Sequence, residues 1–283
     1  MAQPIGLIAG QGRLPIITAQ GIRAAGHPVV CVGLRDQFDP VLPEQCDQFA
    51  AASVGHLSKW IRLMKRWGVT QAVMVGRVQK TRVHDPVSML RMLPDWHAVR
   101  LWLRIRHDTR SDQILGRVAD LLDSYGIRLI DSTQYIPDYL ASEGVLTRTR
   151  PTAAQLADIE FALPIVRRMG EWDIGQSIAV KARDVIAVEA MEGTDEMIHR
   201  AGQLCKTGGW MLVKVAKPGQ DMRFDVPTVG LRTIEQLHAA RAAGLAVEAG
   251  KVILLDKPEL LAAADKAGIT IVGVRLDETP VTP

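Results

Sequence analysis

The segment 213–230, VKVAKPGQDMRFDVPTVG, crowds charged side chains around two prolines. If the middle of this segment is extended, Asp221, Arg223 and Asp225 point to the same side of the chain. Two carboxylates beside cations suit a divalent metal that bridges to a diphosphate, or a carboxylate base that activates water. A salt-bridged surface loop is the alternative, although solvent exposure alone does not require two stiffening prolines. The charged side chains are those of Lys214, Lys217, Asp221, Arg223 and Asp225.

The oxygen-rich character of this segment also predicts which metal it would hold. Carboxylate oxygens are hard ligands that favour Mg²⁺ over zinc, and we expect Asp221 and Asp225 to provide them. The cysteines Cys31, Cys46 and Cys205 form no CxxC pair. A structural zinc site and a disulfide framework are therefore not expected.

A second group of polar residues lies in VEAMEGTDEM, residues 188–197. Glu189 ends a predicted apolar strand, and a helix is expected to begin with Thr194 as its N-cap and Asp195 in its first turn. This arrangement places a carboxylate, a hydroxyl and free backbone N–H groups where a strand meets a helix. Ordinary helix capping explains Thr194 and Asp195, but it does not explain Glu189.

The N-terminal stretch GLIAGQGRLP could bind a phosphate, because Gly10, Gln11 and Gly12 lie where the first predicted strand meets the first helix. Pro15 stands where the dinucleotide fingerprint needs a third glycine, which counts against a nicotinamide site. A backbone nest for another nucleotide or phosphate stays open. So does a tight turn that needs glycine for its geometry alone.

The stretch VGRV ends another predicted strand, and ligands of open α/β sheets bind outside the carboxyl ends of strands. Gly76 would allow close approach, and Arg77 could pair with a phosphate. A surface arginine after a turn is the favoured alternative when this stretch is considered alone.

The region 96–118 is both apolar and basic. It could face an acyl chain and an anionic headgroup, but a helix with one core face and one solvated basic face is the favoured interpretation. No GxSxG occurs, so a Ser/His/Asp hydrolase is not expected. The residues concerned are Trp96, Trp102, Arg104, Arg106, His107, Asp108, Arg110 and Asp112.

The elements that position these residues alternate between strands and helices, which predicts parallel sheets with right-handed crossovers. We expect a Rossmann-like α/β domain over 1–140, a linker over 141–151 and a second α/β domain over 152–283. Strands are predicted over 4–10, 28–34 and 71–78, with helices over 14–26 and 57–69. In the second half a hairpin should turn near residues 182–184, and two short strands should lie within 245–256.

The composition fits a globular protein of 283 residues, with 47% hydrophobic and 23% charged residues. The formal net charge of +3 suits an anionic substrate or a membrane surface, and is too small to indicate nucleic acid. The sequence contains no signal-peptide pattern and no apolar run of about eighteen residues, so we expect a cytoplasmic protein.

Several stretches together resemble the LpxI-type UDP-2,3-diacylglucosamine pyrophosphatases. They occur in family order and cover nearly the whole chain, with the most specific match over 173–256 and the poorest over 79–112. The chain reads GRV where the family often reads GKV, and Gln11 where many members have glycine. The matching stretches are GLIAGQGRLP, VGRV, IDSTQYIPDYLASEGVLT, DIGQSIAVKARDVIAVEAMEGTDEMIHRA, VKVAKPGQDMRFDVPTVG and AGLAVEAGKVILLD.

The resemblance implies two α/β domains with the substrate in the cleft between them. It also implies Mg²⁺-dependent hydrolysis of UDP-2,3-diacylglucosamine to UMP and lipid X, a step of lipid A synthesis at the cytoplasmic face of the inner membrane, and a homodimer. The essential aspartate of the family motif QDxRFDxPT falls on Asp225. The substrate-binding candidates are Gly10, Gln11, Gly12, Gly76, Arg77, Glu189, Thr194, Asp195, Lys214, Lys217, Gln220, Arg223 and Thr228.

Two other classes of function stay open from the residues alone. A nicotinamide-dependent oxidoreductase would bind NAD(P), and a non-catalytic nucleotide- or lipid-binding module would bind its ligand without turnover. Release of UMP from UDP-diacylglucosamine in the presence of Mg²⁺ distinguishes the pyrophosphatase from both.

Overall fold

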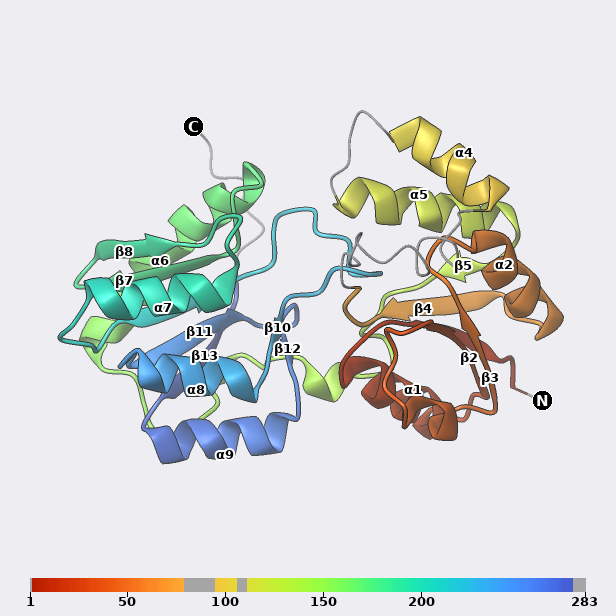
Figure 1. Ribbon diagram of the computed structural model, residues 1–283. Coiled ribbons are helices and arrows are strands. Elements are labelled where there is room, and N and C mark those ends of the chain that lie inside the picture. Colours follow the sequence, from red (N-terminus) through yellow and green to blue (C-terminus); the bar gives the residue numbers. More distant parts are fainter. Residues whose placement is uncertain (1, 79–94, 106–110, 277–283) are drawn as a thin grey trace. The chain divides into compact units, whose positions relative to one another are not determined.

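The computed structural model describes residues 2–78, 95–105 and 111–276, and only the backbone of 101–105, 111 and 112 (Figure 1). The chain divides into two compact units. Unit 1 comprises Met1–Pro137 together with Asp221–Asp225, and unit 2 comprises Asp138–Gln220 and Val226–Pro283. The basic side chains predicted between Trp102 and Asp112 lie outside the described residues.

Unit 1 is built on a five-stranded parallel sheet with the strand order β3-β2-β1-β4-β5. This order, with sequential strands diverging on both sides of β1, is that of a doubly wound α/β fold. Strands β1 and β2 are buried along their whole length, as expected for a sheet that is covered on both faces. The strands are β1 Ile5–Ala9, β2 Val29–Leu34, β3 Gln48–Ala52, β4 Gln71–Val75 and β5 Arg128–Leu129.

Helices cover the two faces of this sheet from opposite sides (Figure 1). Helix α1 (Leu14–Ala24) packs on one face with the 3₁₀ helix η1 (Leu42–Gln45) beside it. Helices α2 (Leu57–Arg66) and α5 (Ser111–Ser124) share the core of the other face, where α4 (Trp96–Ile105) also packs. The predicted Rossmann-like organisation of the N-terminal half is therefore confirmed.

Unit 2 contains a six-stranded mixed sheet with the order β6-β13-β11-β9-β7-β8. Its centre is parallel, and antiparallel strands lie at both edges. A second sheet pairs β10 (Thr228–Val229) with β12 (Ile253–Leu254). The larger sheet consists of β6 Gly144–Val145, β7 Ser177–Lys181, β8 Asp184–Val188, β9 Met211–Lys214, β11 Gly244–Glu248 and β13 Thr270–Val274.

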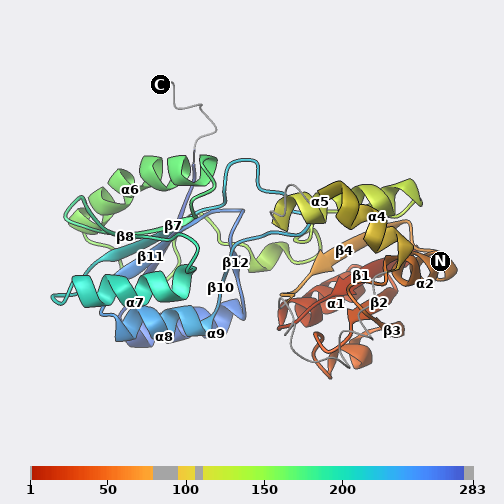
Figure 2. The ribbon, with the colours of Figure 1, turned by 45° about the horizontal axis from the view of Figure 1, so that its top comes forward.

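The helices of unit 2 again lie on both faces of their sheet (Figure 2). Helix α6 (Ala153–Glu171) packs on one face, while α7 (Thr194–Leu204), α8 (Leu231–Ala239) and α9 (Lys257–Ala267) pack on the other. The 3₁₀ helix η2 (Pro137–Tyr139) lies where the chain passes from unit 1 to unit 2. The second α/β domain expected from the sequence is thus present.

The predicted hairpin forms between β7 and β8, and its turn has an identifiable cause. Ala182 and Arg183 both have positive φ, at 52° and 57°, which gives the turn the twist that two-residue hairpins need. The buried carboxylate of Asp158 accepts the backbone N–H groups of both residues, at 3.1 and 2.7 Å. The hairpin is therefore held by a side chain of α6.

None of the helices within the described residues combines the length and the apolar character that crossing a bilayer would require.

Candidate active site

The charged segment after β9 forms a turn, so the expectation of an extended chain is wrong. The backbone N–H groups of Phe224 and Asp225 both donate to the carbonyl oxygen of Asp221, at 3.2 and 3.1 Å. The Asp221 carboxylate also accepts the N–H of Arg223 at 3.0 Å. This side-chain bond to the backbone two residues later favours a turn over a strand. Any meeting of these side chains therefore depends on the turn and not on the alternation of a strand.

Asp221 and Arg223 bind one another within this turn. Arg223 Nε lies 2.9 and 3.0 Å from the two carboxylate oxygens of Asp221. These hydrogen bonds lower the pKa of Asp221 and raise the pKa of Arg223. The carboxylates of Asp120 and Asp123 on α5 also stabilise the charged guanidinium, and the three residues line a cavity of about 400 Å³. The Arg223 guanidinium thus stands among carboxylates.

The turn belongs to unit 1 because its apolar and backbone groups are held there. Phe224 packs against the core shared by α2 and α5. Ser132 donates twice to the carbonyl oxygen of Met222, from its backbone N–H at 3.0 Å and its hydroxyl at 2.8 Å. Asp225 is half-buried at the end of this turn, and the chain re-enters unit 2 at the next residue. Thr228 follows in β10, where its hydroxyl donates to the Val226 carbonyl.

A buried polar cluster lies in unit 2, where β8 and β9 end and α7 begins. Lys214 Nζ donates to the hydroxyl of Thr194 at 3.0 Å, and that hydroxyl donates to Glu189 Oε1 at 2.9 Å. Burial lowers the pKa of Lys214, and the nearby carboxylates of Glu189 and Asp195 oppose this shift. Glu189 Oε2 is buried without a hydrogen-bond partner among the described residues. The structure therefore brings together three predicted site residues.

The predicted N-cap of α7 is wrong by one residue. Gly193 is the N-cap, with φ 84°, and Thr194 is the first helical residue. Because the Thr194 hydroxyl is engaged by Glu189 and Lys214, it makes no capping bond. Asp195 lies in the first turn, as expected, and its carboxylate is 3.1 Å from Arg232 on α8.

Lys217 and Gln220 hold the beginning of the charged segment in unit 2. Lys217 Nζ lies 2.6 Å from the Asp173 carboxylate, just after α6. The Gln220 side chain accepts the backbone N–H of Lys217 at 2.7 Å. Gly170 of α6 allows the close approach, because a Cβ there would lie 2.9 Å from Pro218 Cδ.

Glu248 is a buried residue of this region that the sequence analysis missed. It ends β11, and its carboxylate accepts the backbone N–H of Ala216 at 2.8 Å and pairs with Lys251 at 3.0 Å. It thereby fixes the chain just beyond β9. Its signal in the sequence was the same as that of Glu189, a carboxylate that directly ends an apolar strand.

The two glycine stretches of unit 1 pack against one another at the carboxyl ends of β1 and β4. Gln11 and Arg77 exchange two backbone hydrogen bonds of 2.8 and 3.0 Å. A Cβ on Gly10 would lie 2.6 Å from the carbonyl oxygen of Arg77, and one on Gly76 would lie 2.8 Å from the carbonyl carbon of Gly10. Gly12 differs, since it has φ 100° and no atom of the described residues lies within 4 Å of its Cβ position. Chain packing therefore requires glycine at positions 10 and 76.

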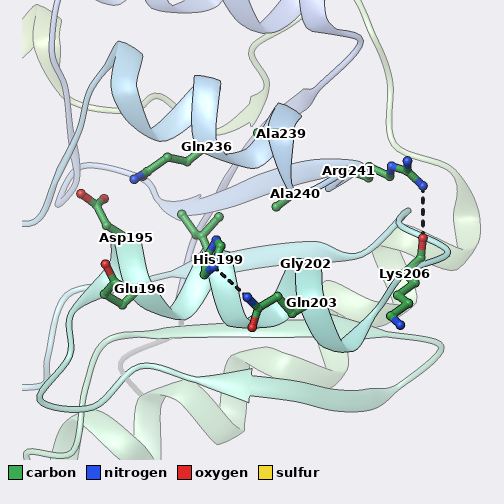
Figure 3. A pocket seen from close by; sticks show the side chains of 11 residues that line it. Asp195, Glu196, His199, Gly202, Gln203, Lys206, Gln236, Ala239, Ala240 and Arg241 are labelled. Carbon is green, nitrogen blue, oxygen red and sulfur yellow. Dashed lines mark hydrogen bonds between the residues drawn. The ribbon is translucent and has the colours of Figure 1, made fainter.

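A cavity of about 790 Å³ lies between α7 and α8 in unit 2 (Figure 3). Of the predicted site residues, Asp195 lines it. Acidic residues stand at the N-terminal end of α7, whereas Lys206 and Arg241 lie at the other end, with His199 bound to Gln203 between them (Figure 3). None of Glu189, Thr194 and Lys214 lines this cavity, although Asp195, whose charge acts on Lys214, does.

The donor set of the charged segment fits Mg²⁺ only in part. Both oxygens of Asp221 accept hydrogen bonds from Arg223, so this carboxylate would bind a metal only by sharing its oxygens with the guanidinium. Asp225 offers hard oxygens, and Mg²⁺ sites often use one or two carboxylates together with substrate phosphates. Within the described residues, His, Cys, Asp and Glu form no group of three or more that could hold a metal.

Comparison with known proteins gives matches along nearly the whole chain. Residues 4–139 match the family model of the LpxI N-terminal domain, and residues 142–272 match that of the LpxI C-terminal domain. The UDP-2,3-diacylglucosamine pyrophosphatase LpxI of Caulobacter vibrioides is 31% identical over 98% of this chain and 99% of its own. A solved biotin carboxylase domain of a single-chain bacterial carboxylase aligns at 15% identity over 77% of this chain and 59% of its own. Its TM-score of 0.22 is too low to support an argument.

Proposed function

Because this chain belongs to the LpxI family, we propose that it hydrolyses the pyrophosphate bond of UDP-2,3-diacylglucosamine. The observation that carries this proposal is a match that spans both halves of the chain and the full length of a relative named for that activity. The chain is accordingly an enzyme of the hydrolase class that acts on a diphosphate bond. This favours the pyrophosphatase over the oxidoreductase and over the non-catalytic module.

We propose UMP and 2,3-diacylglucosamine 1-phosphate (lipid X) as the products. In this reaction an oxygen of water forms a bond to one phosphorus, and the bond from that phosphorus to the bridging oxygen breaks. The bridging oxygen leaves with the other phosphate, and no covalent bond to the enzyme is needed. Hydrolysis in ¹⁸O-labelled water, with the label located by mass spectrometry on UMP or on lipid X, identifies the phosphorus that is attacked.

Asp225 is the residue that we assign to catalysis. It occupies the essential position of the family motif QDxRFDxPT. Its carboxylate would take the proton of the attacking water or hold Mg²⁺, which in turn would neutralise charge on the phosphates. The turn and the Phe224 contact fix where this carboxylate lies.

The buried cluster of unit 2 is our candidate for binding the polar part of the substrate. The first turn of α7 presents backbone N–H groups that favour an anion, and the Lys214 ammonium adds positive charge beside them. Glu189 Oε2, which has no hydrogen-bond partner in the part of the chain that the structure describes, is an acceptor that a substrate hydroxyl or N–H could satisfy. Packing explains Gly10 and Gly76, whereas the described residues leave space beside Gly12 in unit 1.

The test compares Asp225→Asn with Asp221→Asn, two isosteric changes in the same turn. With Mg²⁺ and UDP-2,3-diacylglucosamine, we expect Asp225→Asn to lose at least about 10³-fold in kcat, the scale seen when an acid–base residue is removed. Asp221→Asn should retain turnover at a reduced rate, because it loosens the turn but leaves the catalytic carboxylate. UMP release is followed by chromatography, and circular dichroism confirms folding. Full activity of Asp225→Asn would refute the assignment.

Mg²⁺ dependence and oligomeric state are separate proposals with their own measurements. Removing divalent cations with a chelator should abolish UMP release by the wild type, and adding Mg²⁺ should restore it. The family resemblance also suggests a homodimer, which sedimentation equilibrium of the purified chain would detect as twice the mass of 31.0 kDa.

A further inference from the structure

We propose that Trp172, Ile174 and Met191 form a patch of unit 2 that inserts into a lipid bilayer. The reason for such a contact rests on the proposed function, because a substrate with two acyl chains resides in a membrane. The patch itself rests on the exposure, position and surroundings of these three side chains.

The three side chains are large, apolar and exposed. Trp172 is 68% exposed, Ile174 is 44% exposed and Met191 is fully exposed at 102%. Isolated surface apolar residues are ordinary, but a group of them marks an interaction site. Tryptophan in particular favours the interface between headgroups and hydrocarbon, where its ring is apolar and its N–H stays hydrated.

The patch joins two segments that meet in the fold. Trp172 and Ile174 follow the C-terminal end of α6, and Met191 follows β8. Gly175 packs directly against the backbone carbonyl of Glu189, so closely that an added Cβ would overlap it. Ile174 is one residue before Gly175, and Met191 is two residues after Glu189, so the two side chains lie on neighbouring segments of the chain.

The patch also adjoins both parts of the candidate site in unit 2. Asp173, between Trp172 and Ile174, pairs with Lys217 at the beginning of the charged segment. Met191 lies two residues beyond Glu189 of the buried polar cluster. A bilayer in contact with the patch would therefore hold a lipid headgroup close to the residues that we assign to binding it.

The surrounding charges indicate how the patch would bind. Arg168 pairs with Glu171 at 2.6 Å, Lys217 pairs with Asp173 at 2.6 Å, and Arg200 pairs with Glu192. Since these nearby cations are already matched by carboxylates, attraction to anionic lipids should contribute little. Insertion of apolar side chains should dominate, so binding should depend weakly on ionic strength.

A bilayer fits this patch better than a second copy of the chain does. A stable protein interface buries about 800 Å² on each partner and includes twenty or more residues a side. Three side chains on two short segments fall far below that size, whereas membrane binding has no such minimum interface and strengthens with the apolar area inserted.

Vesicle co-sedimentation tests the proposal with the full-length protein. Vesicles of phosphatidylcholine, with or without one third phosphatidylglycerol, are mixed with the wild type and with a variant that combines Trp172→Ser, Ile174→Ser and Met191→Ser. We expect the wild type to bind both compositions, with less than about a twofold change between low and high salt. The triple variant should lose at least about tenfold in partition coefficient. The matched control is Leu204→Ser, at an exposed leucine ending α7 (63% exposed), which should bind like the wild type.

Several outcomes would overturn the proposal. These are a wild type that does not bind vesicles, a folded triple variant that binds like the wild type, and an equal loss in Leu204→Ser. A triple variant that binds vesicles normally but changes sedimentation coefficient would assign the patch to a protein interface instead. Should the triple variant not fold by circular dichroism, Trp172→Ser and Met191→Ser are measured singly, and each should weaken binding. Vesicle binding needs no turnover, so its result is independent of whether the pyrophosphatase assay succeeds.

Discussion

At the scale of single residues, the ion pair between Asp221 and Arg223 predicts how stability depends on pH. Hydrogen bonds from Arg223 lower the pKa of Asp221 in the folded protein below the unfolded value of about 3.9. The folded state therefore binds this proton more weakly, and the pair stabilises the fold above that value. The contribution is lost as the pH falls through the folded pKa.

We expect the wild type to be more stable than Asp221→Asn at pH 7, and the difference to shrink below about pH 4. Urea unfolding of both proteins at pH 7, 5, 4 and 3 measures it. A stability difference that does not change over this range would show that the lost pair is not the cause. Asp173→Asn, which removes a different ion pair, serves as a comparison for general acid effects.

The buried cluster of Glu189, Thr194 and Lys214 should behave as one unit. Removing one member of a buried ionic pair leaves the other charge unpaired, which costs about 3 kcal/mol. Glu189→Gln and Lys214→Met should therefore each lower the free energy of unfolding by about 3 kcal/mol. The double variant should be more stable than the sum of the two losses predicts by at least about 1 kcal/mol. Urea unfolding of the four proteins gives this cycle, and additive losses would contradict a direct coupling.

At the scale of elements, the ends of β1 and β4 explain why the two glycine stretches have their composition. Gly10 and Gly76 bring two backbone segments together, and Gly12 has a positive φ with no close neighbour among the residues that the structure describes. We expect Gly10→Ala and Gly76→Ala to cost more than about 2 kcal/mol, because an added Cβ meets backbone atoms that cannot move alone. Gly12→Ala should cost about 1 kcal/mol from conformational strain.

Urea unfolding of the three variants distinguishes the two reasons for glycine, which are close backbone packing at positions 10 and 76 and a positive φ at position 12. Equal costs at all three positions would contradict the packing explanation. Binding of a UDP-containing ligand by Gly12→Ala, measured by calorimetry, then reports whether the open space at this position is used. A loss of affinity without a larger loss of stability would support a binding role for the turn.

At the scale of the whole molecule, the chain contributes to unit 1 from two distant parts of the sequence. Residues 221–225 lie between strands of unit 2 in the sequence, yet Phe224 packs in the core under α2 and α5. The proposed catalytic residue thus lies in a segment that packs in unit 1, although the residues before and after this segment belong to unit 2. A substitution that weakens the packing of this segment should therefore destabilise mainly unit 1.

We therefore expect Phe224→Ala to destabilise unit 1 by about 1–2 kcal/mol, the cost of removing a half-buried aromatic ring. Hydrogen exchange followed by mass spectrometry should show faster exchange in β4, β5 and α5. Protection in β9 and β11 should stay unchanged. Faster exchange confined to the strands of unit 2 would contradict the assignment of this segment to unit 1.

The sequence by itself determined the local elements and the family. Apolar runs separated by amphipathic segments predicted the α/β halves, and turn residues at 182–184 predicted the hairpin, because these features depend on neighbours in the sequence. The family motif likewise made Asp225 the proposed catalytic residue. The tertiary structure decided which groups meet: that Arg223 binds Asp221, that Gly10 faces Gly76, and that Lys214 reaches Glu189 through Thr194. Residues far apart in the chain make most of these contacts. Side chains at such separations meet only when strands and helices pack, so spacing in the sequence cannot specify them.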